Sequence, residues 1–341
     1  MSPAAFYRLC FATLAAVIAA VALWLGAPSY SADKAFGQKL APDLLEKIND
    51  IAVMSVEHAG ETTTFVKGSD GNWFLMEASG YIADRERIRN ALIGLANLEK
   101  IEPKTALPEY YPDIQVEDAG PNAQSYLVTL LNANGETLLH LLVGKSTSGI
   151  RWNGQGYYVR KPDEARSWLV RGAVDVTGDA LTWMDTELSA FKESDIASVT
   201  IVDSSKKREA TYKRADRFSK MQPVSASDNY FLKSAAFVDG MTKALSTMNF
   251  TAVERRPSDW DKIDPYLSVM VETYDGLTQY FFVYLINDVP FAAFSFRSAD
   301  SASDTVKNYA AALQKGFAAW IYRIPAEKVA AISPFYNKPA S

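Results

Sequence analysis

Cysteine and histidine are almost absent: the 341 residues include one cysteine, Cys10, and two histidines, His58 and His140. This excludes a disulfide framework and a zinc site built on thiolates. The two histidines lack metal-ligand spacing, and neither G-x-S-x-G nor H-E-x-x-H occurs. A hydrolytic triad would need the fold to bring a serine and an acid to one of them. We therefore assign no catalytic, cofactor-binding or metal-binding residue, and the partner-binding residues stay unknown.

The chain also lacks an excess of positive charge. It carries 35 lysines and arginines against 40 aspartates and glutamates, and its pI is about 5.3. A nucleic-acid surface requires basic residues clustered on one face, and the sequence holds no such cluster. Nucleic acid is thus excluded as a partner.

Polar side chains are missing from Phe11 to Leu25 except at Thr13, and Arg8 is the charged residue before this run. Extended to residues 4–27, the segment approaches the length that spans a bilayer. The preceding positive charge places the N-terminus in the cytoplasm. We therefore expect a single-pass anchor (1–28) in a bacterial inner membrane, with the soluble body in the periplasm. A cleaved signal peptide ending near residues 29–31 is the alternative.

The first half has the pattern of a hairpin followed by an amphipathic helix. Residues 62–66 and 73–76 read as strands around a turn at 68–72, and Asp84 can cap the helix. The apolar face of that helix carries Ile88, Ala91, Leu92, Leu95 and Leu98. We then expect a long loop at 102–121, a hairpin at 126–143 turning at Asn134-Gly135, a strand at 156–160, and a short helix from Pro162 through Leu169.

The second half repeats this order. The matched landmarks are Ile51 with Ile196, Leu92 with Leu245, Asn134-Gly135 with Asp275-Gly276, and Val159–Pro162 with Tyr322–Pro325. Residues 304–315 predict an inserted helix. The fold class is therefore α+β, with two tandem repeated units, each an antiparallel sheet with a helix packed on one face. The expected divisions are a linker (29–41), a first unit (42–180) and a second unit (181–341).

Several of these segments resemble the family of domain-of-unknown-function 4340 proteins, of proteobacterial type. The resembling residues are Gly71-Asn72-Trp73, Tyr81–Asp84, Ala91–Leu98, Lys104-Thr105, Pro108–Tyr111 and Ala319–Pro325. Ile82 departs from the family, whose members usually have proline there. The resemblance implies an envelope protein associated with ATP-driven transporters of the gliding-motility type. It implies no catalytic residue.

Four other patterns suggest chemistry weakly. Gly144-Lys145-Ser146-Thr147 resembles the end of a phosphate-binding loop, but Leu139 occupies the required glycine position, so we interpret it as a loop after a strand. Asp259, Asp261 and Asp264 favour a capped turn over a calcium loop. Lys206–Arg208 is interpreted as a solvated turn. The aromatic residues that could line a sugar or peptide groove are Trp73, Tyr81, Tyr110, Tyr111, Trp152, Tyr157 and Tyr158.

Two functions follow as hypotheses. The first is a non-catalytic, membrane-anchored accessory or binding protein that contacts the inner membrane, a transporter permease and its ATPase. The second is an envelope glycan-active enzyme that uses a carboxylate pair, which leaves no sequence motif.

Overall fold

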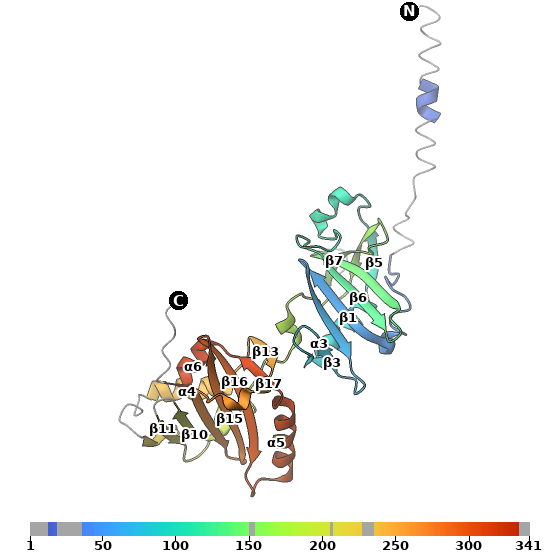
Figure 1. Ribbon diagram of the computed structural model, residues 1–341. Coiled ribbons are helices and arrows are strands. Elements are labelled where there is room, and N and C mark those ends of the chain that lie inside the picture. The colour runs from blue at the N-terminus through green and yellow to red at the C-terminus, as the bar shows by residue number, and fades with distance from the viewer. Residues whose placement is uncertain (1–12, 19–35, 150–153, 205–206, 227–234, 334–341) are drawn as a thin grey trace, which may run out of the picture. The chain divides into compact units, whose positions relative to one another are not determined.

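The computed structural model describes residues 13–18, 36–149, 154–204, 207–226 and 235–333 (Figure 1). Residues 13–18 are helical, and the rest of the predicted anchor (1–28) lies outside the described ranges. Within those ranges no helix is long and apolar enough to cross a membrane. Trp152, Lys206 and most of the predicted linker also lie outside them.

The described chain forms two antiparallel sheets with a few helices, so the predicted α+β class is confirmed. The first sheet contains β1 (Ile51–His58), β2 (Glu61–Lys67), β3 (Trp73–Leu75), β4 (Tyr81–Ile82), β5 (Glu99–Pro103), β6 (Tyr126–Asn132), β7 (Thr137–Gly149), β8 (Gly154–Arg160) and β9 (Ser167–Arg171). The second contains β10 (Ile196–Asp203), β11 (Arg208–Lys213), β12 (Gln222–Ala226), β13 (Ala252–Arg255), β14 (Leu267–Thr273), β15 (Leu277–Ile286), β16 (Val289–Ser298) and β17 (Trp320–Arg323).

The helices lie between these strands in the chain. They are α3 (Arg85–Ala96), α4 (Ala235–Ser246), α5 (Asp304–Phe317) and α6 (Ala326–Ile332). Single 3-10 turns are η1 (Ile48–Asp50), η2 (Pro108–Tyr110), η3 (Pro112–Ile114), η4 (Ala180–Trp183), η5 (Glu193–Asp195) and η7 (Trp260–Lys262).

Local chemistry explains where the main elements begin and turn. The Asp84 carboxylate accepts the backbone N–H groups of Glu86 and Arg87, which caps α3 as predicted. Gly135 and Gly276 have positive φ angles of 81° and 89° in the turns between β6 and β7 and between β14 and β15. Glycine takes this conformation at low cost, so both predicted hairpin turns are confirmed.

The two sheets have the same strand order. From edge to edge the first is β4-β3-β2-β1-β6-β7-β8-β9-β5, and the second is β12-β11-β10-β14-β15-β16-β17-β13. With β4 set aside, each strand of the first sheet has a counterpart at the same sheet position and the same place in the chain. In both halves the third strand is followed by a helix, and the next strand joins the opposite edge.

Matching side-chain environments accompany this order. Residues 168–171 in β9 read Trp-Leu-Val-Arg, and residues 320–323 in β17 read Trp-Ile-Tyr-Arg. Each tryptophan ring is covered by a cation 4.5 Å from its centroid, Lys100 over Trp168 and Arg255 over Trp320. The edge strand that follows the helix supplies the cation in both halves.

The segment after that edge strand also matches. In Pro108-x-x-Tyr111 and Pro257-x-x-Trp260, the backbone N–H of the aromatic residue donates to the proline carbonyl, at 3.1 Å and 3.2 Å. Both rings are buried, with 6% of Tyr111 and 2% of Trp260 exposed. Tyr111 packs against Arg160, whereas Trp260 packs against Tyr284.

Among the helices and strands, β4, α5 and α6 have no counterpart in the other half; α6 follows the last strand of the second sheet, whereas β4 and α5 come before the last strand of theirs. α5 lies in the β16–β17 connection, where the β8–β9 connection consists of residues 161–166 alone. It packs along β16 (Figure 1). β17 pairs with β16 only at Phe291 and Ala292. Gln314 from α5 accepts the Phe296 N–H at 2.8 Å farther along β16, so α5 satisfies a strand edge that β17 leaves open.

Contacts divide the chain into two compact units. The first unit holds residues Met1–Ile51, Glu57–Glu61 and Asn90–Val176. The second unit holds Ala52–Val56, Thr62–Arg89 and Thr177–Ser341. The second unit therefore includes the middle of β1, β2 from Thr62 onward, β3, β4 and the first turn of α3. The domain limits expected from the sequence stay a prediction.

Two predictions that concern β8, β9 and β17 are wrong. The expected helix from Pro162 through Leu169 is a turn followed by β9. Residues 167–170 are all buried between β5 and β8, so they show neither strand alternation nor a helical face. The match of Val159–Pro162 in the first half with Tyr322–Pro325 in the second is also wrong. Arg160 ends β8, whereas Arg323 ends β17, which is the counterpart of β9. The predicted helix at 304–315 is confirmed as α5.

Candidate functional site

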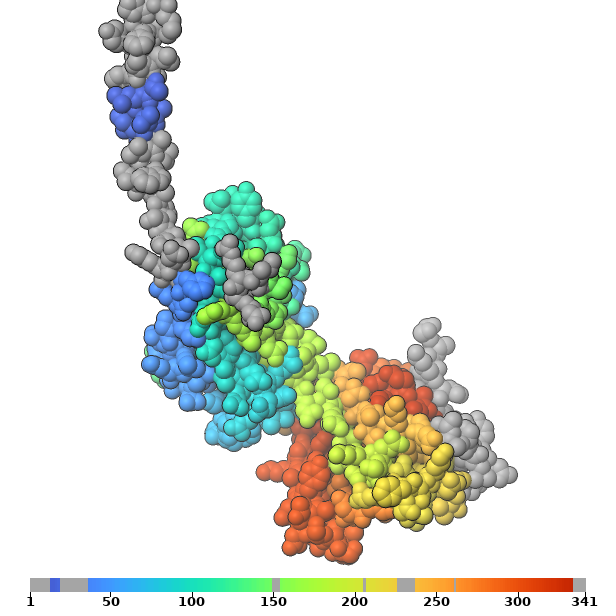
Figure 2. Space-filling view, turned by 180° about the vertical axis from the view of Figure 1, so that it is seen from behind, coloured from blue at the N-terminus to red at the C-terminus, as the bar shows by residue number. Residues whose placement is uncertain are grey.

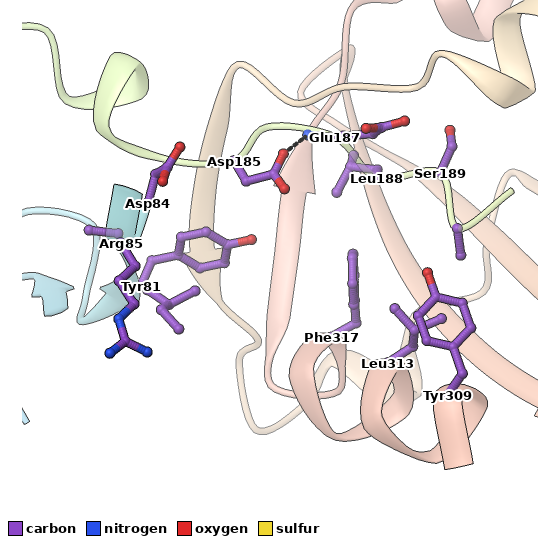
Figure 3. A pocket seen from close by; sticks show the side chains of 13 residues that line it. Tyr81, Asp84, Arg85, Asp185, Glu187, Leu188, Ser189, Tyr309, Leu313 and Phe317 are labelled. Atoms are coloured by element: carbon purple, nitrogen blue, oxygen red, sulfur yellow. Dashed lines mark hydrogen bonds between the residues drawn. The ribbon is translucent and has the colours of Figure 1, made fainter. Parts of the chain in front are cut away.

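A pocket of about 540 Å³ lies in the second unit, and three separate chain segments line it. These are residues 81–85 of β4 and the start of α3, residues 185–190, and three side chains of α5, Tyr309, Leu313 and Phe317. Figure 3 shows the α5 side chains rising from one side, with Leu188 pointing toward them. Two of the three elements that have no counterpart in the other half, β4 and α5, thus contribute to this pocket.

Hydrogen bonds to Gln279 and Met248 hold residues 185–190 in place. Gln279 on β15 is fully buried; its Nε2 donates to the Leu188 carbonyl at 2.7 Å, and its Oε1 accepts the Ala190 N–H at 3.0 Å. The Leu188 N–H donates to the Met248 carbonyl at 2.8 Å. The backbone N–H groups of Leu188 and Ala190 therefore bond within the protein and are not available to a ligand.

The pocket floor is apolar and rests on an aromatic cluster. Tyr81 is 8% exposed, and its ring meets those of Phe250, Trp320 and Tyr322 edge-on at 5.6, 5.0 and 6.1 Å. Phe317 packs against Phe294 and Tyr322. These contacts cover most of the ring faces, which leaves Tyr309, 47% exposed, as the accessible aromatic ring of the pocket.

The hydroxyl groups of Tyr81 and Tyr322 stay protonated at neutral pH. Burial raises the pKa of Tyr81, and its hydrogen bond with Tyr322 partly opposes that rise. Burial also raises the pKa of Tyr322, and the neighbouring Tyr81 raises it further. Both groups therefore act as structural hydrogen-bonding groups and not as bases.

The pocket rim is acidic. Asp84 caps α3, Asp185 accepts the Glu187 N–H at 3.0 Å, and Glu187 is exposed beside them. The one basic lining residue, Arg85, points away from Asp185 and Glu187 in Figure 3. The arrangement therefore presents fixed negative charge above an apolar floor.

Two other hollows lie apart from this pocket, and the second of them, at about 580 Å³, is similar to it in volume. One of about 310 Å³ in the first unit is lined by residues 40–47, by β7 around His140, and by Lys161 and Asp163. The other, in the second unit, lies between the β15–β16 turn and residues 323–327. His140 is exposed on β7, and no other candidate from the sequence joins it there.

The structure places the phosphate-loop resemblance inside β7, so the interpretation of Gly144–Thr147 as a loop is wrong. A Cβ at residue 144 would lie 2.3 Å from the Ile114 carbonyl oxygen. Close passage of another backbone segment therefore explains the glycine.

The remaining candidates lie apart from one another. The His58 ring stacks on Tyr126 with centroids 4.1 Å apart, and its Nδ1 lies 3.1 Å from the Ser125 carbonyl oxygen. Asp259 and Asp261 lie at the 3-10 turn η7, where Trp260 is buried. In the part of the chain that is described, no three histidine, cysteine or acidic side chains gather as metal ligands. Lys207 lies in a turn and Arg208 begins β11.

The aromatic candidates divide between core and surface. Trp73 and Tyr111 are buried, Tyr110 is exposed, and the Tyr157 hydroxyl donates to the Val174 carbonyl at 3.3 Å. Tyr158 lies on β8, and the Lys104 ammonium group lies over its ring. Of the members of this set that the structure describes, only Tyr81 lines the candidate pocket. The sequence analysis did not identify Tyr309 and Phe317 as pocket residues. Their position on the inserted helix α5 was the one feature that could have indicated them.

A family model described as a domain of unknown function, DUF4340, matches residues 73–266, more than half of the chain. The chain belongs to the DUF4340 family. The match runs from β3 to the residue before β14, so it includes β4 and residues 185–190 of the pocket but not α5. No curated protein and no solved structure matches the chain. DUF4340 membership assigns no activity.

Proposed function

We propose that this DUF4340 protein is a non-catalytic accessory protein, anchored in the inner membrane, whose periplasmic body binds a transporter permease. Its two sheets are proposed to be tandem copies of one unit. The shared strand order and the matched Trp168 and Trp320 environments support the duplication. A gliding-motility-type transporter, with its ATPase, is the partner that the family resemblance favours.

The observation that carries a binding role is the pocket of the second unit. Duplicated scaffolds keep their common elements for folding, and added elements distinguish one copy from the other. Here β4, α5 and α6 are the additions, and two of them, β4 and α5, line the same pocket. Figure 2 shows the outer surface of α5 (orange-red) open to solvent, in agreement with its single buried residue, Ala310.

Photo-crosslinking in intact cells tests this function. A photoreactive amino acid at Tyr309, which is exposed, should capture a permease, recovered together with its ATPase. The same probe at Phe218, which is 99% exposed on the β11–β12 connection, serves as the control position. Capture of no transporter component at Tyr309, combined with cleavage of peptidoglycan by the purified chain, would instead favour the glycan-active enzyme.

That enzyme is the second candidate because Asp185 and Glu187 share one pocket rim. Paired carboxylates suffice for glycoside hydrolysis. Both side chains are exposed to water, however, and a catalytic acid usually needs a buried setting. A charge-bearing binding surface fits them better.

The proposed topology predicts the activity of reporter fusions. Alkaline phosphatase fused after Ser341 should be active, since it folds only in the periplasm, whereas a cytoplasmic reporter at the same site should be inactive. Replacing residues 11–25 with polar residues should abolish the phosphatase signal. The opposite pattern, an active cytoplasmic reporter with inactive phosphatase, would exclude the proposed location.

A further inference from the structure

We propose that the pocket of the second unit binds a short peptide segment in which a lysine or arginine lies next to an apolar side chain. The proposal rests on the binding function above and names the chemistry of the partner at this site. The pocket volume of about 540 Å³ suits a few side chains and not a folded domain.

Charge complementarity selects a basic residue. Asp84, Asp185 and Glu187 line the rim, and Arg85, the basic lining residue, points away from the latter two (Figure 3). Asp84 and Asp185 are fixed because each accepts backbone N–H groups, so little conformational entropy is lost when a cation binds them. An ammonium or guanidinium group placed here would interact with a preorganised negative rim.

The floor selects an apolar neighbour. Leu188 is 1% exposed, and it faces Leu313 and Phe317 across the pocket. An aliphatic side chain would bury surface against Leu313 and Phe317, which are partly exposed. Tyr309 at the edge is half exposed and can lie along the stem of a lysine or stack under a guanidinium.

A sugar fits this pocket less well. Carbohydrate sites need accessible aromatic faces, and the Tyr81 and Phe317 rings pack edge-on or tilted against core aromatics. An anion is also disfavoured. The Asp84 carboxylate occupies the N-terminus of α3, and the Leu188 and Ala190 N–H groups already have partners. A cationic peptide is the ligand that satisfies both rim and floor.

The test uses the full chain in detergent micelles and a phage-displayed library of random 12-residue peptides. Enriched peptides should share a lysine or arginine beside an apolar residue. Their affinity should fall about tenfold or more in Glu187→Lys, several-fold in Tyr309→Ser, and at high salt. Glu109→Lys, a matched charge reversal on an exposed 3-10 turn of the first unit, should leave the affinity unchanged.

A charge exchange makes the test specific. Replacing the basic residue of a selected peptide with glutamate should abolish binding to the unaltered chain and restore it to the Glu187→Lys variant. All these substituted side chains are exposed, so thermal unfolding should not change.

Three outcomes would overturn the proposal. These are no enriched peptide, enriched peptides without basic residues, and affinities that Glu187→Lys leaves unchanged. Binding of a chito-oligosaccharide that the same variants abolish would also overturn it, in favour of a glycan. Peptide binding without a permease crosslink would refute the proposed function alone, whereas a crosslink unaffected by Glu187→Lys would refute this inference alone.

Discussion

Leu92→Asp should unfold the first unit. Leu92 is 6% exposed on the buried face of α3, beside Ala91 and Leu95. Truncating a buried leucine costs about 2–5 kcal/mol, and leaving a carboxylate there without a partner adds several more. The sum approaches the whole stability of an ordinary domain, about 5–15 kcal/mol. Hydrogen exchange should show lost amide protection in β6–β9, with protection in β14–β17 retained.

Asn90→Asp provides the control for this experiment. Asn90 is exposed on the same helix, so the same carboxylate faces water there and protection should persist. Unchanged exchange in Leu92→Asp would mean that the apolar face of α3 does not support the first unit. Simultaneous loss in both sheets would mean that the two contact units unfold as one.

The sequence predicts those elements whose causes are local. β2 and β3 cover the hairpin predicted at 62–66 and 73–76 to within one residue at each end, and α3 begins after the predicted cap Asp84. Asn134-Gly135 and Asp275-Gly276 determine their turns through glycine conformation. In each case a few neighbouring residues carry both the signal and the physical cause.

Prediction from the sequence fails where tertiary contacts determine the local structure. Residues 167–170 are buried on every side, so the two-residue alternation that identifies a strand is absent, and the nearby Pro162 suggested a helix. Gly144 is required by a backbone segment some thirty residues away, at Ile114. No local pattern reveals either effect.

The candidate pocket illustrates the same limit. Its lining residues come from 81–85, 185–190 and 309–317, and none of these segments contains a recognisable motif. The alignment of the two halves offers the missing signal. The pocket lies where β4 and α5 interrupt the correspondence, and locating such interruptions requires the strand order and not the sequence alone.

Gln279→Leu should destabilise residues 188–190, which line this pocket. The side chain is fully buried, and it binds the Leu188 carbonyl and the Ala190 N–H. Leucine has similar volume but neither hydrogen-bonding group, so two backbone groups would lose their partners. Each orphaned buried group costs about 1–3 kcal/mol, which predicts a loss of about 2–6 kcal/mol in total. Urea unfolding of the second unit should report it.

The decisive measurement is local. Amide exchange at Leu188 and Ala190 should accelerate more than exchange in β14 or β16, because those strands keep their own ladder bonds. Peptide binding at the pocket should weaken in parallel, since Leu188 forms its floor. Gln222→Leu, the same change at an exposed position on β12, should leave both unchanged. Equal destabilisation by the two variants would show that lost polarity, and not the link from Gln279 to residues 188–190, is responsible.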